Sequence, residues 1–339
     1  MNQKQLAEYN MVRSAVGFFD FSLSTKIYIS GRESLIFLNR LMGGNVETMH
    51  NGKIINSLFM RDDGSLLATV WVLKDEAHYI ILTDAEKRVV LFEWIMKYAE
   101  DYDVQIEDKT EIFGSIVIVG PKGQELLMAI AGDDIIGLPY LGFEHNTQTN
   151  CLICRIGYSG EYEYRLIFPN ERYDNLQRQI MEKGGEYGMT HCDKDILDTL
   201  MFEMKLVNQN KDILEDTTPI QAGLHWMIDF RKSEFVGRDA VMKEKKSPSK
   251  KLLLLLSEER MDIPDQAKLF IENIACGLIV KKSFSPTLNK DIFLAYIDEK
   301  FAWVGINFDI ETIHQERGQV RTVSGPLFIT KTLNEAASH

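Results

Sequence analysis

Apolar positions along residues 1–245 follow two spacings: a period of two, which predicts strands, and a period near 3.6, which predicts helices. The strand-like segments are 27–30, 53–60, 66–74, 78–83, 103–106, 115–119, 151–156 and 162–168. The helix-like segments are 31–42, 85–99, 121–132, 171–184, 193–206 and 237–245. Because the two kinds of segment are interspersed without a repeated strand–helix–strand unit, the pattern predicts an α+β fold.

A lysine- and serine-rich segment, KEKKSPSKK at 243–251, interrupts this pattern. Its composition is typical of a linker and marks a domain boundary. Beyond it, residues 251–331 read as short strands separated by turns, which predicts a small β barrel or sandwich. The run LLLLL at 252–256 is far shorter than the roughly 20 residues that cross a bilayer, so it is predicted to be a buried strand. We therefore expect one region at 1–245 and a second domain at 246–339.

The chain is acidic, with 38 Lys and Arg against 50 Asp and Glu, a formal net charge of −12 over 339 residues. Phosphate groups bind basic surfaces, so this balance argues against nucleic acid and against an anionic membrane as partners. The length is that of two or three domains. The N-terminal residues lack the basic and then apolar pattern of a signal peptide, which predicts a cytoplasmic protein.

Cys151 and Cys154 form the most metal-like motif, with His191 and Cys192 as a conceivable second pair of ligands. Against a zinc site, CLICRI at 151–156 has the pattern of a strand, and free cysteines often behave as small buried apolar residues. Adjacent residues are also awkward ligands for one metal ion. The sequence favours core cysteines, and we predict no metal site.

Lysines gather near the linker, at positions 243, 245, 246, 250 and 251. In an acidic protein, such a cluster can meet the carboxylates of a ligand tail or an acidic carrier protein. The alternative is a solvated helix end with no partner.

Six segments carry recognisable motifs in a fixed order. They are VRSAVGFFDFSLSTKIYISGRESLIFLNRL (12–41), MRDDGSLLATVWVL (60–73), RIGYSGEYEY (155–164), EDTTPIQAGLHWMID (215–229), FVGRDAVMKEK (235–245) and KSFSPTLNKDIFLAYID (282–298). Together they resemble the T-protein (aminomethyltransferase) family of the glycine cleavage system. The resemblance implies a three-domain cloverleaf around a central channel that holds tetrahydrofolate. Two interleaved domains would occupy the first 245 residues, and a β barrel would form the third domain.

The resemblance also implies binding residues. The pterin-binding glutamate of the family falls on Glu203, whose carboxylate can accept two parallel hydrogen bonds from a pterin edge. Tyr158 matches a tyrosine near the folate, and Asp84 stands where the family has an asparagine, so it keeps an acceptor but lacks the amide donor. Further expected cofactor contacts are Trp226, Lys251 and Tyr296.

The reactive end of the family site is replaced in this sequence. Ala68 and Thr69 stand at the positions of a paired aspartate that includes the catalytic one. The other departures are Leu23 for a histidine, Arg165 for a glutamate and Asp265 for an arginine. A carboxylate can stabilise positive charge at the attacking nitrogen, and Thr69 carries no charge at neutral pH. Thr69 and Tyr158 are the candidate catalytic residues.

This pattern is similar to relatives in which tetrahydrofolate accepts a methyl group from an O-, S- or N-methylated small molecule. The sequence therefore predicts a tetrahydrofolate-dependent one-carbon transferase, or demethylase, with a small-molecule donor. One alternative is a diverged aminomethyltransferase that uses a lipoyl carrier protein; another is a folate-binding protein without turnover. A related iron–sulfur assembly factor is disfavoured, because the matching segment RKSEFVGRDA at 231–240 lacks the cysteine of that branch.

Overall fold

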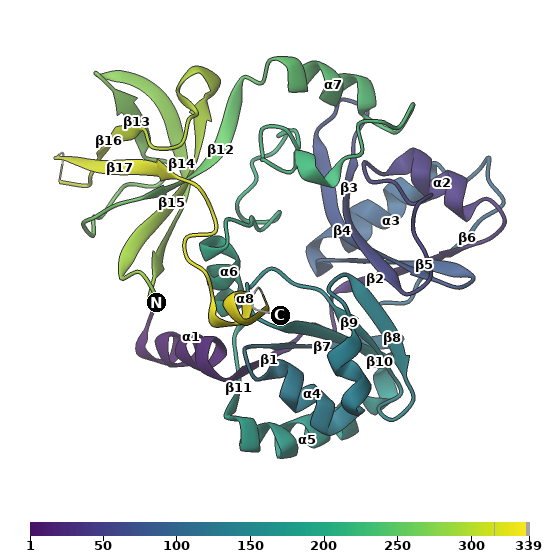
Figure 1. Cartoon of the computed structure of the whole chain (residues 1–339). Helices are drawn as coiled ribbons and strands as arrows, with labels where there is room; N and C mark the ends of the chain where they lie inside the picture. The colour runs from purple at the N-terminus through teal and green to yellow at the C-terminus, as the bar shows by residue number, and fades with distance from the viewer. Residues whose placement is uncertain (315, 337–339) are drawn as a thin grey trace.

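A computed structural model describes residues 1–314 and 316–336, and it contains two separate β structures. One is a long mixed sheet, and the other is a closed barrel of six antiparallel strands. Figure 1 shows them as three lobes, with the barrel forming one lobe and the two halves of the long sheet forming the others. The helix α6 (Lys194–Glu203) lies where the three lobes meet. The predicted α+β fold class and the C-terminal barrel are both confirmed.

The long sheet has 11 strands, and its order brings distant segments of the chain together. From edge to edge these are β11 (Met189–His191), β1 (Val16–Asp20), β7 (Phe113–Val119), β10 (Glu163–Pro169), β9 (Cys151–Arg155), β8 (Gly142–Asn146), β3 (Lys53–Met60), β4 (Leu66–Asp75), β5 (His78–Thr83), β2 (Thr25–Ser30) and β6 (Gln105–Asp108). The two halves meet where β8 pairs with β3 through one register position, Lys53 with Gly142. The ladder between the halves is therefore much shorter than those within each half.

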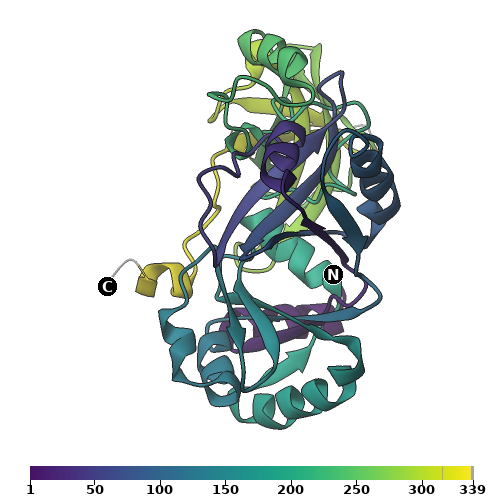
Figure 2. The same cartoon turned by 90° about the vertical axis from the view of Figure 1, so that its right-hand side faces the viewer.

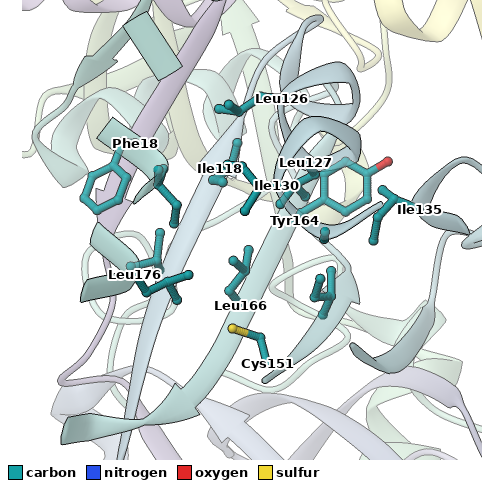
Figure 3. Packing of buried hydrophobic residues seen from close by; sticks show 14 of the residues in the cluster. Phe18, Ile118, Leu126, Leu127, Ile130, Ile135, Cys151, Tyr164, Leu166 and Leu176 are labelled. Carbon is teal, nitrogen blue, oxygen red and sulfur yellow. The ribbon is translucent and has the colours of Figure 1, made fainter. Parts of the chain in front are cut away.

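Helices cover the outer faces of both halves (Figure 2). The other helices are α1 (Gln3–Ser14), α2 (Ser34–Leu41), α3 (Arg88–Lys97), α4 (Gly123–Ala131), α5 (Tyr173–Gly184), α7 (Arg238–Lys246) and α8 (Lys331–Ala336). Figure 3 shows the core beneath α4 and α5, where Leu127 and Leu176 pack on Ile118 and Leu166 of the sheet. A matching core joins α2 and α3 to the other half.

A third apolar cluster lies on the inner faces of the two halves and joins them. It takes Trp71 and Leu82 from β4 and β5, and Cys154, Ile156 and Ile167 from the strands of the other half. Each large apolar side chain removed from water in this way contributes about 1.5–3 kcal/mol. This inner cluster therefore fixes the relative position of the two halves, and the cavity described below lies beside it.

The barrel begins shortly after α7 ends at Lys246. Its strands are β12 (Lys250–Leu256), β13 (Lys268–Ile271), β14 (Ile274–Ser285), β15 (Lys290–Asp298), β16 (Asn307–Glu311) and β17 (Arg317–Val323). The closed order is β12-β15-β14-β13-β16-β17. The predicted LLLLL strand at 252–256 is the buried first strand of the barrel. All four cysteines are buried, and no helix within the described residues is long and apolar enough to cross a membrane.

The structure contains five helices and strands that the apolar pattern did not predict, namely α1, β1, β8, β11 and α8. In α1, Glu8, Tyr9 and Val12 are buried along a largely polar helix, so periodicity gives almost no signal. The predicted helix 193–206 ends earlier, because Lys205 adopts a positive φ of 61° that stops the helix. Residues 216–230 form turns and one short 3₁₀ helix, His225–Met227.

Candidate functional site

A cavity of about 290 Å³ opens beside the inner apolar cluster, between the two halves of the long sheet. Its walls come from β4 and β5, from the segment after β9, from β10, and from α6 with the loop that follows it. Its volume lies at the lower end of the roughly 300–1,000 Å³ of ligand pockets. Side chains from five distant segments therefore meet at one enclosed space.

Two aromatic rings form one wall of this cavity. Trp71 and Tyr158 stack with their centroids 4.8 Å apart and their planes 30° apart, and both line the cavity. Trp71 is only 9% exposed, and burial raises the pKa of the Tyr158 hydroxyl well above its ordinary value. The wall therefore presents flat apolar faces, and Tyr158 stays a neutral hydroxyl at physiological pH.

The side-chain amide of Gln209 forms hydrogen bonds with the backbone of β4 where that strand lines the cavity. Its Oε1 accepts from the backbone N–H of Thr69 at 2.6 Å, and its Nε2 donates to the Thr69 carbonyl at 3.3 Å. The same amide nitrogen reaches the Thr83 hydroxyl at 3.2 Å and the Asp84 carboxylate at 3.0 Å. Gln209 therefore pairs with Thr69 as a neighbouring strand would, and it links Thr69 to Asp84.

Acceptor atoms without partners also line the cavity. Asp84 Oδ2 accepts from Gln209 and from Asn210 Nδ2 at 2.8 Å, whereas Oδ1 makes no hydrogen bond with another described residue. The buried Oδ1 of Asn56 also lacks a hydrogen-bond partner among the described residues. An unpaired buried acceptor is costly, so Asn56 Oδ1, with the free and partly exposed Oδ1 of Asp84 beside the same cavity, favours a ligand with hydrogen-bond donors.

Opposite charges alternate on β10, where Glu163 and Arg165 share one face of the strand and both line the cavity. Glu163 Oε2 accepts from the backbone N–H groups of Tyr158 and Ser159 at 3.0 and 3.2 Å, and burial raises the pKa of its carboxyl. The Arg165 guanidinium lies over the ring of Phe21, 5.0 Å from its centroid. Among the described residues, no hydrogen bond or ion pair engages this guanidinium.

Lys26 lies behind the same wall and is fully buried. Its ammonium donates to the carbonyls of Ser22 and Ser24 at 2.9 and 2.7 Å. Burial, with the nearby Arg165 and Arg88, lowers the pKa of this amine to about 7. The cavity is therefore bordered by cations that the protein itself leaves largely unneutralised.

Three of the residues predicted from the sequence line this cavity together: Thr69, Asp84 and Tyr158. Leu23 and Arg165, two of the departures from the family pattern, line it as well. The remaining predicted contacts lie elsewhere in the molecule.

Glu203 is fully buried and lies outside the lining of the cavity. Its carboxylate accepts from Tyr9 at 2.7 and 2.8 Å, from Arg13 Nη2 at 2.7 Å and from the Ser285 hydroxyl at 2.5 Å. Since α1, α6 and the end of β14 supply these groups, the carboxylate holds three parts of the chain together. A pterin would have to displace one of these donors, so its binding at Glu203 stays a prediction that this geometry does not favour.

Trp226 and Lys251 line a second, more open hollow of about 500 Å³ between the barrel and α7. Trp226 is 51% exposed, and Lys251 forms an ion pair with Glu299 at 3.1 Å. Tyr296 is 3% exposed within the barrel-side core, where its hydroxyl lies 3.4 Å from that of Thr217. It lines neither hollow, so contact between Tyr296 and a cofactor is an expectation that its position does not favour.

Sequence reasoning missed Trp71, Asn56, Gln209 and Glu163 as cavity residues. Two signals were present: Trp71 lies two residues after Thr69 and so shares its face of β4, and charged residues at 163 and 165 are unusual inside a central strand. Gln209 gave no signal, because its contacts depend on how the loop after α6 reaches across to β4.

Comparison with known proteins places these features in a family context. The family described as "GCVT N-terminal domain" matches residues 1–232. The aminomethyltransferase of Caldanaerobacter subterraneus subsp. tengcongensis is 29% identical over 310 residues, which cover 90% of this chain and 83% of that protein. The aminomethyltransferase of Bacillus subtilis (strain 168) is 28% identical over 327 residues, covering 95% and 90%.

A solved structure shares the whole architecture. The glycine cleavage system aminomethyltransferase T from Bartonella henselae superposes with a TM-score of 0.88 at 22% identity, over 97% of this chain and 90% of that one. The overall fold implied by the six sequence segments is thereby confirmed.

Proposed function

Since this chain belongs to the glycine cleavage T-protein (GCVT) family, we propose that it transfers a one-carbon group from a small methylated donor to tetrahydrofolate. The observation that carries the proposal is the cavity wall in which stacked Trp71 and Tyr158 lie beside the unpaired acceptors Asn56 Oδ1 and Asp84 Oδ1. A pterin is a flat ring with N–H donors along one edge, so its shape and its polarity both fit this wall.

Tetrahydrofolate, when bound, supplies the ring nitrogen that accepts the one-carbon group. The aromatic pair holds the ring by stacking, and the Asn56 and Asp84 oxygens orient its donor edge. Thr69 offers a neutral hydroxyl, so it cannot replace the charge of the family aspartate. Asp84 supplies a carboxylate in the same hydrogen-bonded group, through Gln209, and can stabilise positive charge at the reacting nitrogen and take up its proton.

Calorimetry with tetrahydrofolate tests the binding half of the proposal. We expect Trp71→Ala to lower the affinity by about 10-fold or more, because stacking of a ring on an aromatic face contributes about 1–3 kcal/mol. Trp303→Ala, a change of the same kind at an exposed barrel residue, should leave the affinity as in wild type. Failure of the wild-type protein to bind tetrahydrofolate would sink the proposal.

Turnover is tested by incubating the folate complex with O-, S- and N-methylated small molecules and detecting methyl-tetrahydrofolate by mass spectrometry. Asp84→Asn should slow product formation while tetrahydrofolate still binds, and Asp134→Asn, an exposed carboxylate, is the matched control. Folate binding with no product from any donor would leave a folate-binding protein without turnover.

A second candidate is aminomethyl transfer from a lipoyl carrier protein. The hollow lined by Trp226, Lys245, Lys246 and Lys251 favours it, because an exposed aromatic residue with surrounding lysines suits an acidic protein partner. In this case Thr69→Asp should raise the rate with an aminomethyl-loaded carrier. A rate that stays at the wild-type level, with folate still bound, counts against this candidate.

A further inference from the structure

Arg165 is a charged residue in the middle of a sheet whose guanidinium the protein does not neutralise. Its Cα lies opposite Val117 of β7 and Cys154 of β9, so its backbone is hydrogen-bonded into the sheet between these two strands. The side chain lines the cavity and lies over Phe21. No carboxylate oxygen of the described residues lies within the 4.0 Å of an ion pair. Burial of a cation without such a partner costs several kcal/mol, which a ligand anion can offset.

The carboxylates near Arg165 are engaged elsewhere. Glu163 accepts from two backbone N–H groups, and Asp84 accepts from Gln209 and Asn210. Asp20 accepts from the backbone N–H of Ser22 at 2.8 Å. Each therefore has donors of its own, and the five N–H donors of Arg165 stay available on the cavity side.

Lys194 adds positive potential at this wall, and Lys26 adds only part of a charge, because its pKa of about 7 leaves the amine about half protonated at neutral pH. The buried Lys26 ammonium has backbone carbonyls as its hydrogen-bond partners. Lys194 lies at the mouth, with its ammonium 4.6 Å from the centroid of the Phe21 ring that Arg165 also contacts. Phe21 thus contacts both cations and shields part of the guanidinium from water. In such a partly desolvated place, a planar guanidinium is well suited to bind a carboxylate with two parallel hydrogen bonds.

We propose that Arg165 binds a carboxylate group of the ligand that occupies this cavity, so that the one-carbon donor is a small methylated carboxylic acid. The identity of the donor rests on the proposed function. The existence of an anion site at Arg165 does not depend on it. A carboxylate in the tail of tetrahydrofolate has the same chemistry, and the experiment separates the two sources.

The test measures the affinity of matched probes by calorimetry. The probes are methoxyacetate, (methylthio)acetate and N-methylglycine, each compared with its primary amide, which has nearly the same shape but lacks the negative charge. We expect at least one acid to bind the wild-type protein on the order of 10- to 100-fold more tightly than its amide, as for a charge-assisted bidentate contact. Arg165→Gln should abolish this preference, and Arg178→Gln, an exposed arginine on α5, should preserve it.

A second arm compares tetrahydrofolate with the primary amide of tetrahydropteroate, which lacks the glutamate tail and carries no carboxylate. If Arg165→Gln weakens only tetrahydrofolate, and no acid probe is preferred, the cofactor tail is the carboxylate that Arg165 binds, and the donor assignment is overturned. If the wild-type protein binds acids and amides equally, and binds tetrahydrofolate and the amide of tetrahydropteroate equally, the anion site itself is overturned. Folate-dependent turnover can still be observed after either result, and acid binding can still be observed if turnover fails. The failure of the anion site and the failure of the proposed function are therefore distinguishable.

Thermal unfolding of the Arg165 variants shows whether a loss of binding is caused by a loss of folding. Because Arg165 has no internal partner, Arg165→Gln should unfold at the wild-type temperature or above it. A structural arginine would lower that temperature. Arg165→Lys keeps the charge but loses the bidentate geometry, so it should fold and retain a reduced preference for acids. Full preference in Arg165→Lys would contradict bidentate binding.

Discussion

At the scale of single residues, the site is unusual for the charges it buries. Glu163 and Arg165 lie on the central strand β10, and Lys26 lies on β2 of the other half with its amine near Arg165. Buried charges are destabilising unless they are paired. Backbone groups bind Lys26 and Glu163, whereas no hydrogen bond or ion pair within the described residues engages Arg165, and a bound anion would supply one.

The pKa of Lys26 makes the stability of the protein depend on pH. Arg165, Arg88, Asp108 and Asp20 surround the amine, and burial with the two arginines lowers its pKa from 10.5 to about 7. Between about pH 7 and 10.5 the unfolded chain holds a proton that the folded one has lost, so this residue makes stability rise with pH. The slope is at most about 1.4 kcal/mol per pH unit.

Lys26→Met removes this contribution. The free energy of unfolding of the variant, measured relative to wild type by urea denaturation, should be highest at or below pH 7 and should fall as the pH rises toward 10.5. Lys53→Met, at an exposed lysine, should show a difference that does not change with pH. A flat difference for Lys26→Met would show that the amine stays protonated across this window.

At the scale of elements, the cavity depends on the loop after α6, whose Gln209 side chain pairs with β4 as a neighbouring strand would. The segment after α6 places Gln209 against Thr69 of β4, where the β4–β5 ladder ends at the pair Trp71 and Leu82. Thr83 also donates to the Thr69 carbonyl at 2.8 Å. The N–H and C=O of Thr69 are thereby paired although the ladder with β5 has ended on that side, while β3 still lies on the other side at Leu58.

Gln209→Ala should leave the Thr69 N–H without its partner and remove one of the two donors to Asp84 Oδ2. We expect a loss of about 1–3 kcal/mol in the free energy of unfolding, and weaker tetrahydrofolate binding because Asp84 is no longer oriented. Gln179→Ala, an exposed glutamine on α5, serves as the control for both measurements. Unchanged stability and unchanged binding together would contradict this role for Gln209.

Most regular elements could be predicted from periodicity, because strands such as β3 and β5 and helices such as α5 carry clear apolar patterns. α1 could not, since its buried face includes Glu8 and Tyr9, whose partners are distant in sequence. The same reason explains the site. Thr69, Asp84 and Tyr158 were found through motifs, whereas Gln209 and Asn56 depend on contacts across lobes that no local pattern records.

At the scale of the whole molecule, Glu203 of α6 joins the barrel to the lobe that contains α1. Arg13 links it to Glu161 at 2.9 Å and to the Ser159 carbonyl at 2.8 Å, and the Thr287 hydroxyl lies 2.6 Å from that of Tyr9. The C-terminal segment covers this network, with the Phe328 ring 5.2 Å from the Arg13 guanidinium. A buried arginine between two carboxylates is stable only while every partner is in place.

Glu203→Gln should therefore lower the free energy of unfolding by about 3–5 kcal/mol, because it leaves Arg13 with one carboxylate in a buried site. Glu182→Gln on the exposed face of α5 should have almost no effect. The same variants settle the role of the residue in binding. If Glu203 is a clamp, the folded fraction of Glu203→Gln binds tetrahydrofolate with wild-type affinity; a large loss of affinity would restore the pterin-binding role implied by the family resemblance.

The position of these partners along the chain also has a consequence for synthesis. Tyr9 and Arg13 leave the ribosome long before Ser285 and Phe328 do. The network around Glu203 therefore cannot be completed until the barrel and the segment that follows it have been made. Until then, a nascent chain of this protein carries Arg13 without its full set of partners.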